Sequence, residues 1–150
     1  MSAANNYIEE IKNAKIIREE VLEDTGIVTI GIKVFGEEFY ESAYCNQEDL
    51  KYFSPKIGCT LSHMRAMRSA LVYKIGEIKT RYDVLHHVYG GITSARDPHE
   101  VDPTGKFKLQ LDRYENQYHE LVQAKRSLDK EITMYIKDIG KAIDSMSKNI

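Results

Sequence analysis

Two long stretches of the sequence repeat apolar residues at alternating intervals of four and three positions. The first covers residues 54–89, and nine of its ten repeat positions are apolar: Ile57, Leu61, Met64, Arg68, Leu71, Ile75, Ile78, Tyr82, Leu85 and Tyr89. In the second, eleven of twelve are apolar: Phe107, Leu111, Tyr114, Tyr118, Leu121, Lys125, Leu128, Ile132, Tyr135, Ile139, Ala142 and Met146. A sustained period of about 3.5 residues is typical of helices that pack as a coiled coil. The sequence therefore predicts two long helices.

A polar segment rich in turn residues, residues 90–105, joins the two predicted helices. It begins with Gly90-Gly91, which we expect to end the first helix, and glycine and proline mark turns within it. This connection predicts an antiparallel hairpin of coiled-coil type. Its register brings together three apolar pairs and two pairs of opposite charge: Tyr89 with Phe107, Ile78 with Tyr118, Ile57 with Ile139, Arg65 with Asp129, and Lys79 with Glu115.

Residues 1–53 combine one predicted helix with one predicted β-hairpin. Apolar residues at spacings of three and four favour a helix over residues 3–24, and Gly26 follows as a stop signal. The period then changes to two, with residues 39–44 as a returning strand. Because two strands alone are marginal in water, we expect this hairpin to pack on the helices or to pair with another chain. The residues predicted to form this strand edge are Val28, Ile30, Ile32 and Val34.

The expected fold class is mainly α (α+β): an N-terminal helix, one β-hairpin and a long antiparallel helical hairpin. Residues 1–150 would form a single elongated domain, with residues 1–53 holding the helix and β-hairpin and residues 54–150 the helical hairpin. A helix of about 36 residues is roughly 54 Å long, so the first helix covers only part of the hairpin. Apolar residues beside the seam need a further cover, from the first helix or a second copy: Val122, Ile136 and Ile143.

Composition narrows the class of protein. Hydrophobic residues make up 42% of the chain and charged residues 29%, which is ordinary for a globular protein. No apolar run approaches the ~20 residues that cross a bilayer, and the first residues do not resemble a signal peptide. Cys45 and Cys59 lack the companions of a zinc site or a disulfide framework. We therefore expect a cytoplasmic protein, or one within an assembled particle, that is not secreted and not bound to a membrane.

The charge is distributed unevenly along the chain. Residues 1–53 carry 11 acidic and 5 basic side chains, whereas residues 54–89 carry 6 basic and 2 acidic ones. We expect the acidic N-terminal part to lie against the basic helix. Arg68 and Lys125 interrupt the two apolar repeats in adjacent layers of the predicted hairpin. They form either a polar layer that sets the register, pairing with Glu19 or Glu20, or an internal anion site; we prefer the polar layer.

No catalytic or cofactor motif is recognisable, and we expect neither a cofactor nor an enzymatic activity. Three residues near the turn of the helical hairpin are weak candidates for metal ligands, namely His86, His99 and Asp102. They lack a spacing that places two ligands on one helix face, so we predict no metal site.

The architecture favours a non-enzymatic structural, assembly or interaction protein that acts through the helical hairpin and the exposed β-hairpin. Its partners would be proteins, either further copies or subunits of a larger complex such as a viral particle. An alternative is a small nucleic-acid-associated accessory or regulatory factor, which would use Arg65, Lys74, Lys79 and Arg81. A third is a metal-dependent enzyme at residues 86–102.

Overall fold

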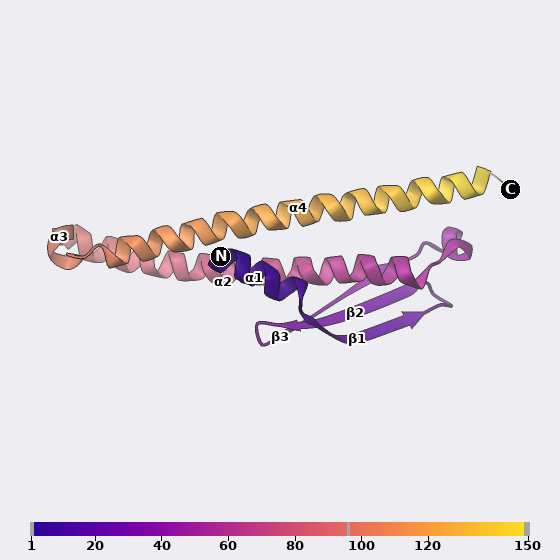
Figure 1. Ribbon diagram of the computed structural model, residues 1–150, viewed down its shortest axis with the longest axis horizontal. Helices are drawn as coiled ribbons and strands as arrows, with labels where there is room; N and C mark the ends of the chain where they lie inside the picture. The colour runs from indigo at the N-terminus through magenta and orange to yellow at the C-terminus, as the bar shows by residue number, and fades with distance from the viewer. Residues whose placement is uncertain (1, 96, 149–150) are drawn as a thin grey trace.

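The computed structural model describes residues 2–95 and 97–148 and shows a mainly helical, elongated molecule (Figure 1). It confirms the fold class of an N-terminal helix, an antiparallel β-sheet and a long helical pair. The elements, in chain order, are α1 Ala3–Lys12, β1 Lys15–Leu22, β2 Ile27–Val34, β3 Glu37–Tyr44, the 3-10 helix η1 Gln47–Tyr52, α2 Pro55–Ala95, α3 Pro98–Val101 and α4 Lys106–Lys148.

Helices α2 and α4 run antiparallel along the whole length of the molecule, as the apolar repeats predict (Figure 1). Near their connection the rings of Tyr89 and Phe107 lie 6.3 Å apart, centroid to centroid. Farther along, Ile78 belongs to the same buried cluster as Tyr118 and Leu121. The register of the hairpin is therefore confirmed at these positions.

The connection between the two helices is shorter than predicted. Helix α2 continues through Gly90-Gly91 to Ala95, and α3 occupies part of the expected loop. Glycine inside a helix costs only about 1 kcal/mol relative to alanine, which a long packed helix tolerates. The sharp turn comes instead at Gly105, whose φ of +69° is the conformation that favours glycine.

A second face of α2 packs on the β-sheet. Small residues recur along it at intervals of four: Gly58, Ser62, Ala66 and Ala70. A Cβ atom at Gly58 would lie 2.4 Å from Cγ2 of Val28, and the buried Ser62 hydroxyl donates to the backbone oxygen of Val28 at 2.8 Å. Small side chains thus allow the helix backbone to approach β2 closely.

The sheet has three strands in the order β1-β2-β3, all antiparallel. The additional strand, β1, comes from residues that we predicted to be helical, so the expectation of a helix over residues 3–24 was wrong beyond Lys12. A bulge between Ile16 and Arg18 shifts the register of β1 on β2. The bulge breaks the two-residue alternation that would have indicated a strand.

Strand β2 lies in the centre of the sheet and not at its edge. It pairs with β1 on one side and β3 on the other. The expected edge residues are buried on the face that α2 covers: Val28, Ile30, Ile32 and Val34. The strand edge predicted at these residues was therefore wrong, because residues 15–22 fill the position beside β2.

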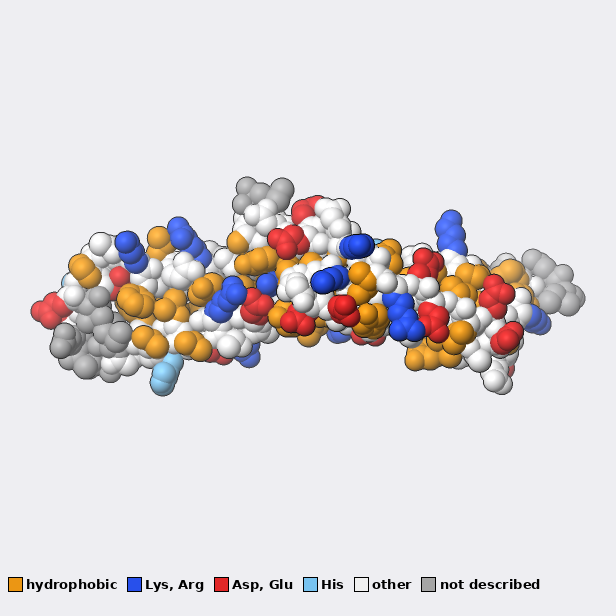
Figure 2. Space-filling model, turned by 90° about the horizontal axis from the view of Figure 1, so that it is seen from below, with side chains coloured by type: hydrophobic (Ala, Val, Ile, Leu, Met, Phe, Trp, Pro, Cys, Tyr) orange, Lys and Arg blue, Asp and Glu red, His pale blue; other side chains and the backbone are white. Residues whose placement is uncertain are grey.

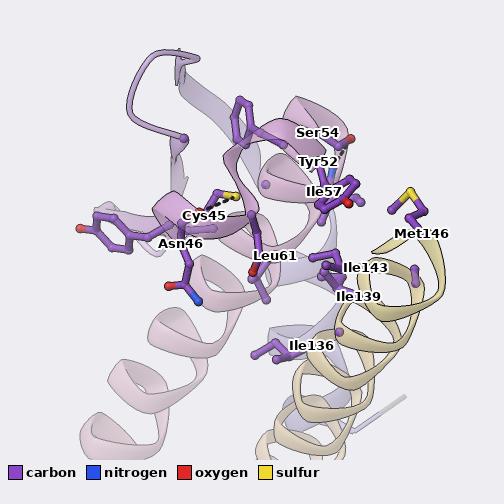
Figure 3. A pocket seen from close by; sticks show the side chains of 18 of the residues that line it. Cys45, Asn46, Tyr52, Ser54, Ile57, Leu61, Ile136, Ile139, Ile143 and Met146 are labelled. Atoms are coloured by element: carbon purple, nitrogen blue, oxygen red, sulfur yellow. Dashed lines mark hydrogen bonds between the residues drawn. The ribbon is translucent and has the colours of Figure 1, made fainter. Parts of the chain in front are cut away.

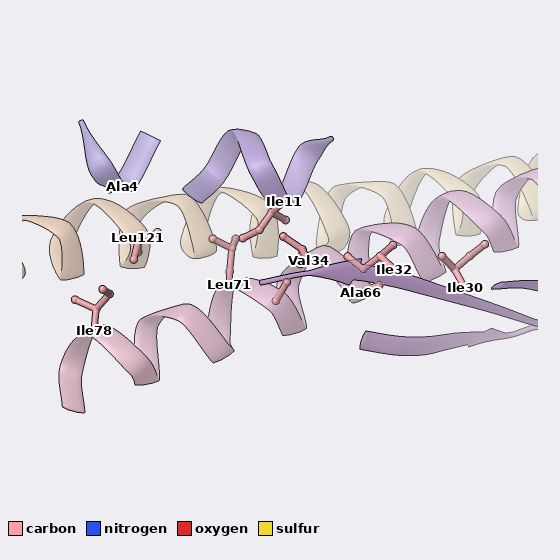
Figure 4. Packing of buried hydrophobic residues seen from close by; sticks show 10 residues of the cluster. Ala4, Ile11, Ile30, Ile32, Val34, Ala66, Leu71, Ile78 and Leu121 are labelled. Atoms are coloured by element: carbon pink, nitrogen blue, oxygen red, sulfur yellow. The ribbon is translucent and has the colours of Figure 1, made fainter. Parts of the chain in front are cut away.

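Helix α1 covers the middle of the helical hairpin and contacts both α2 and α4 (Figure 4). Ala4 and Ile11 are buried beside Leu71 and Leu121 in the main core cluster. Lys74 of α2 lies under this helix with only 6% exposure. Its Nζ atom lies 4.6 Å from the ring centroid of Tyr7 and 4.1 Å from that of Phe35, a cation–π arrangement that ties α1 to the β2–β3 turn.

The core is therefore concentrated where α1, α2, α4 and the sheet meet, and both ends of the hairpin extend beyond it (Figures 1 and 4). Within residues 2–95 and 97–148, no helix combines the length and apolar character needed to span a membrane.

Candidate interaction site at the open end of the helical hairpin

Helix α4 diverges from α2 toward the C-terminus, where the hairpin has no connecting turn (Figure 1). A pocket of about 320 Å³ lies at this open end. Its walls come from the beginning of α2, the C-terminal part of α4, the end of β3 and η1. We call it the open-end pocket.

The lining of the open-end pocket is mainly apolar (Figure 3). Helix α2 contributes Ile57 and Leu61, and the facing helix contributes Ile136, Ile139 and Ile143. These residues follow helical spacings of three and four, so each helix presents one apolar row to the pocket. Ile57 is 36% exposed and Ile136 is 44% exposed. The chain itself therefore leaves part of this apolar surface open to solvent.

A small buried cluster forms the inner end of this region. Ala43 of β3, Leu61 of α2 and Ile132 of α4 pack together, with Met64 and Tyr135 partly buried against them. Helices α2 and α4 are thus in contact at this cluster, and they separate beyond it toward the C-terminus of α4.

Two charged side chains line the open-end pocket, Arg65 and Asp49. Arg65 donates from Nη1 to the backbone oxygen of Ser42 at 3.0 Å. Asp49 belongs to η1 and lies near Cys45; burial first, and then the Asp49 carboxylate, raise the pKa of the Cys45 thiol above its ordinary value. Cys45 and Cys59 are both free thiols.

The two charged residues of the seam, Arg68 and Lys125, share one carboxylate. Arg68 donates from Nε to Oδ1 of Asp129, and Lys125 donates from Nζ to Oδ2 at 3.1 Å. Burial alone would raise the pKa of Asp129, but the hydrogen bonds and charges of the two cations outweigh it and lower that pKa. This is the polar layer that we preferred, with a different partner from the one expected.

Two predicted charge pairs are wrong. Asp129 is engaged by Arg68, one helical turn from the expected Arg65. Glu20 pairs with Arg18, and Glu19 accepts a hydrogen bond from the Cys59 thiol at 3.2 Å. Both glutamates lie on β1, where neighbouring side chains point to opposite faces of the sheet, and neither forms an ion pair with Arg68 or Lys125. The acidic N-terminal part does lie on α2, but within the described residues no ion pair joins the two.

The three apolar residues beside the seam that we expected another segment to cover have different surroundings. Ile136 and Ile143 line the open-end pocket, whereas Val122 lies earlier in α4, is half-buried and does not line it. We did not expect Arg65 or η1 at this site from the sequence. Ser54-Pro55 marks the start of α2, but nothing in residues 47–52 indicates that η1 would fold back over the pocket.

The three weak metal candidates have separate roles. Asp102 accepts hydrogen bonds from the backbone amides of Phe107 and Lys108 at the beginning of α4, His86 stacks on Tyr82 with ring centroids 5.5 Å apart, and His99 is exposed. Within the described part of the chain, no three His, Cys, Asp or Glu side chains are close enough to hold a metal ion.

The basic residues of α2 do not form one accessible patch. Lys74 is buried under α1, Arg81 pairs with Glu77, and Arg65 lines the open-end pocket, which leaves Lys79 exposed near Glu115. The face seen in Figure 2 mixes acidic and basic side chains along its length. The structure thus does not bring together the four cations on which the nucleic-acid alternative depends.

A second groove lies near the connected end, between α2 and α4. It encloses about 450 Å³ and includes Val84, Val88 and Tyr114 in its lining. Only two helices form its walls, whereas the open-end pocket is also walled by the sheet and η1. The open-end pocket is therefore the better-formed site.

No protein-family model, curated protein or solved structure matches this chain significantly. Function is therefore inferred from the geometry of the open-end pocket.

Proposed function

We propose that this chain is a non-enzymatic interaction or assembly protein, and that a partner protein docks at the open-end pocket. The long pair of helices would act as a rigid support that holds the pocket at one end of the molecule. A component of a larger complex, inside the cell or within an assembled particle, fits such a design.

One observation carries this proposal: the apolar rows of α2 and α4 continue beyond the buried cluster of Ala43, Leu61 and Ile132 and line the pocket. Ile57, Ile136 and Met146 are each more than one-third exposed and line the same pocket. Contiguous apolar surface with a polar rim commonly marks a site where another protein docks. Two helices that diverge around an apolar groove are, in addition, a recurrent geometry for holding a third segment.

The fluorescent dye ANS, which binds exposed apolar surface, tests whether the pocket is open in solution. We expect the wild-type chain to enhance ANS fluorescence in a saturable way. The variant Ile136→Glu should reduce this enhancement several-fold, because it places a charge inside the pocket. Met134→Glu is a matched control, since Met134 is 58% exposed on the same helix and does not line the pocket.

Circular dichroism should show equal helicity for all three proteins. Equal ANS fluorescence in all three would contradict the proposal, because the dye would then report a surface other than the pocket.

A further inference from the structure

Arg65 differs from the other cations that are partly or fully buried. Among the described lysine and arginine residues, four are buried or half-buried: Arg65, Arg68, Lys74 and Lys125. Three of them pair with a carboxylate: Arg68 and Lys125 with Asp129, and Lys74 with Glu77. No acidic side chain in the described part of the chain lies within ion-pair distance of Arg65. Charges removed from water are usually paired, so the partly buried Arg65 lacks the counter-charge that the other three cations have.

The bonding of the Arg65 guanidinium leaves it able to bind an anion. A guanidinium has five N–H donors in a planar fork that matches a carboxylate. Arg65 uses a donor on one atom, Nη1, toward the backbone oxygen of Ser42, and this bond fixes the side chain against β3. The carboxylate that shares the pocket lining, Asp49, does not pair with it. A charged hydrogen bond beside apolar walls is stronger than one in open water.

The position of Arg65 in the pocket defines the pattern of its ligand. Ile57, Leu61 and Arg65 follow each other at intervals of four on α2, so all three lie along one face. Across the pocket, α4 offers Ile136, Ile139 and Ile143. A helix seated in the open part of the pocket would meet these apolar side chains and would find the guanidinium at the inner end, beside the cluster in which Leu61 packs with Ile132.

We propose that the open-end pocket binds an acidic amphipathic helix of a different protein. Apolar residues of that helix, spaced three or four apart, would fill the pocket. An aspartate or glutamate one turn farther along the same face would pair with Arg65. This inference rests on the proposed function and specifies the chemistry of the partner.

A second copy of this chain fits the site less well. Most apolar residues in the repeats of its described helices already pack in the core clusters or line the pocket, and the apolar side chains left exposed outside the pocket include Val84 and Val88 on α2 and Leu109 and Met134 on α4. A separate chain with a free apolar face does not have to give up such contacts in order to bind.

Selection from a phage-displayed library of random peptides tests the inference on the full chain. Peptides of about 15 residues form four helical turns, which is enough to span the pocket. Parallel selections use the wild type, Arg65→Leu and Arg65→Glu. Arg126→Leu is the control, because Arg126 is exposed on α4 and does not line the pocket.

We expect wild type and Arg126→Leu to select peptides that carry Asp or Glu one turn beyond paired apolar residues. Arg65→Leu should lose the acidic preference, and Arg65→Glu should select Lys or Arg at that place. A synthetic copy of a selected peptide should bind Arg65→Leu at least about tenfold more weakly, since a partly desolvated charge pair is lost. Methyl NMR shifts of Ile136, Ile139 and Ile143 show whether a peptide occupies the pocket.

The outcomes separate this inference from the proposed function. Peptides that shift the pocket methyls but show no acidic preference, or bind Arg65→Leu equally well, would overturn the inference and leave the proposed function standing. If no peptide shifts these methyls, both fail. If the methyl signals shift with protein concentration alone, the pocket binds a second copy of this chain. If decanoate shifts them and no peptide does, the pocket binds a small aliphatic acid. Either result overturns the inference.

Discussion

Gly58 shows how a single residue sets the distance between α2 and the sheet. An added Cβ would meet two atoms of Val28, at 2.4 and 3.0 Å, and Val28 is itself fully buried. Neither side can move away easily, because a buried β-branched side chain has few alternative rotamers.

We predict that Gly58→Ala destabilises the protein even though alanine is the better helix former. Overpacking of a core typically costs about 1–3 kcal/mol, which exceeds the ~1 kcal/mol that alanine contributes in a helix. Gly76→Ala is the matched control on the same helix, because nothing lies within 4 Å of its added Cβ. Its free energy of unfolding should rise by up to about 1 kcal/mol.

Urea unfolding followed by circular dichroism measures both changes. If the two variants gain stability equally, the close approach of α2 to β2 does not exist in solution.

Cys59 offers a test of the contact between α2 and β1. Burial first, and then the hydrogen bond and charge of Glu19, raise the pKa of the Cys59 thiol to about 11. The folded protein therefore favours the protonated thiol, and this contribution to stability is complete below the ordinary thiol pKa and is lost as the pH rises toward 11.

In a Cys45→Ser background, we predict that the rate of alkylation of Cys59 rises with a midpoint near pH 11 in the folded protein. In the urea-unfolded chain the midpoint should lie near the ordinary value of about 8.5. Glu19→Gln should lower the folded midpoint, since it removes the negative charge. A folded midpoint near 8.5 would show that the thiol is not held by β1.

Among single residues, the sequence identified the seam positions but not their charge partners. Asp129 pairs with Arg68, whereas Arg65, three positions earlier, lines the pocket. A rotation of α2 about its axis by a fraction of a turn exchanges these two roles. The heptad pattern does not fix that rotation, because it ignores the second, sheet-facing side of α2.

At the level of elements, long patterns were predictable and short ones were not. The repeats of α2 and α4 persist over many turns, so their period is unambiguous. Residues 15–22 contain apolar pairs at Ile16-Ile17 and Val21-Leu22, which suit a helix face as well as a bulged strand. The small residues of α2 at intervals of four, from Gly58 to Ala70, were the one available signal for a sheet-covered face.

We predict that cysteines placed at Ile78 and Tyr118 form a disulfide within one chain, in a background that lacks Cys45 and Cys59. Both positions contact the same core cluster. A control pair at Ile78 and Tyr135 should not cross-link, because Tyr135 lies 17 residues farther along α4, roughly 25 Å away. Mass spectrometry after mild oxidation distinguishes the two results.

Equal cross-linking of both pairs would mean that α4 slides along α2. If the cysteines at positions 78 and 118 form disulfides only between two chains, the two helices do not pair within one molecule.

At the scale of the whole molecule, the main feature is that the other elements cover the helical hairpin only in part. Helix α1 covers α2 and α4 around the middle of the hairpin, the sheet covers the first half of α2, and at the open end α4 diverges from α2 around the open-end pocket (Figure 1). A chain that needed only to be stable would gain by closing this end, since apolar surface removed from water contributes roughly 25 cal/mol per Å². We therefore propose that a partner covers this open surface.

The most direct test of this account is photo-cross-linking from residue 136 in cells that naturally contain the protein. A benzophenone amino acid replaces Ile136 inside the pocket or, as a control, Met134 outside it. The account predicts one discrete adduct with a second, different protein from position 136, which Ile143→Glu abolishes and which position 134 does not give. The absence of an adduct, or the same adducts from both positions, would contradict the claim that the open-end pocket is an interaction site.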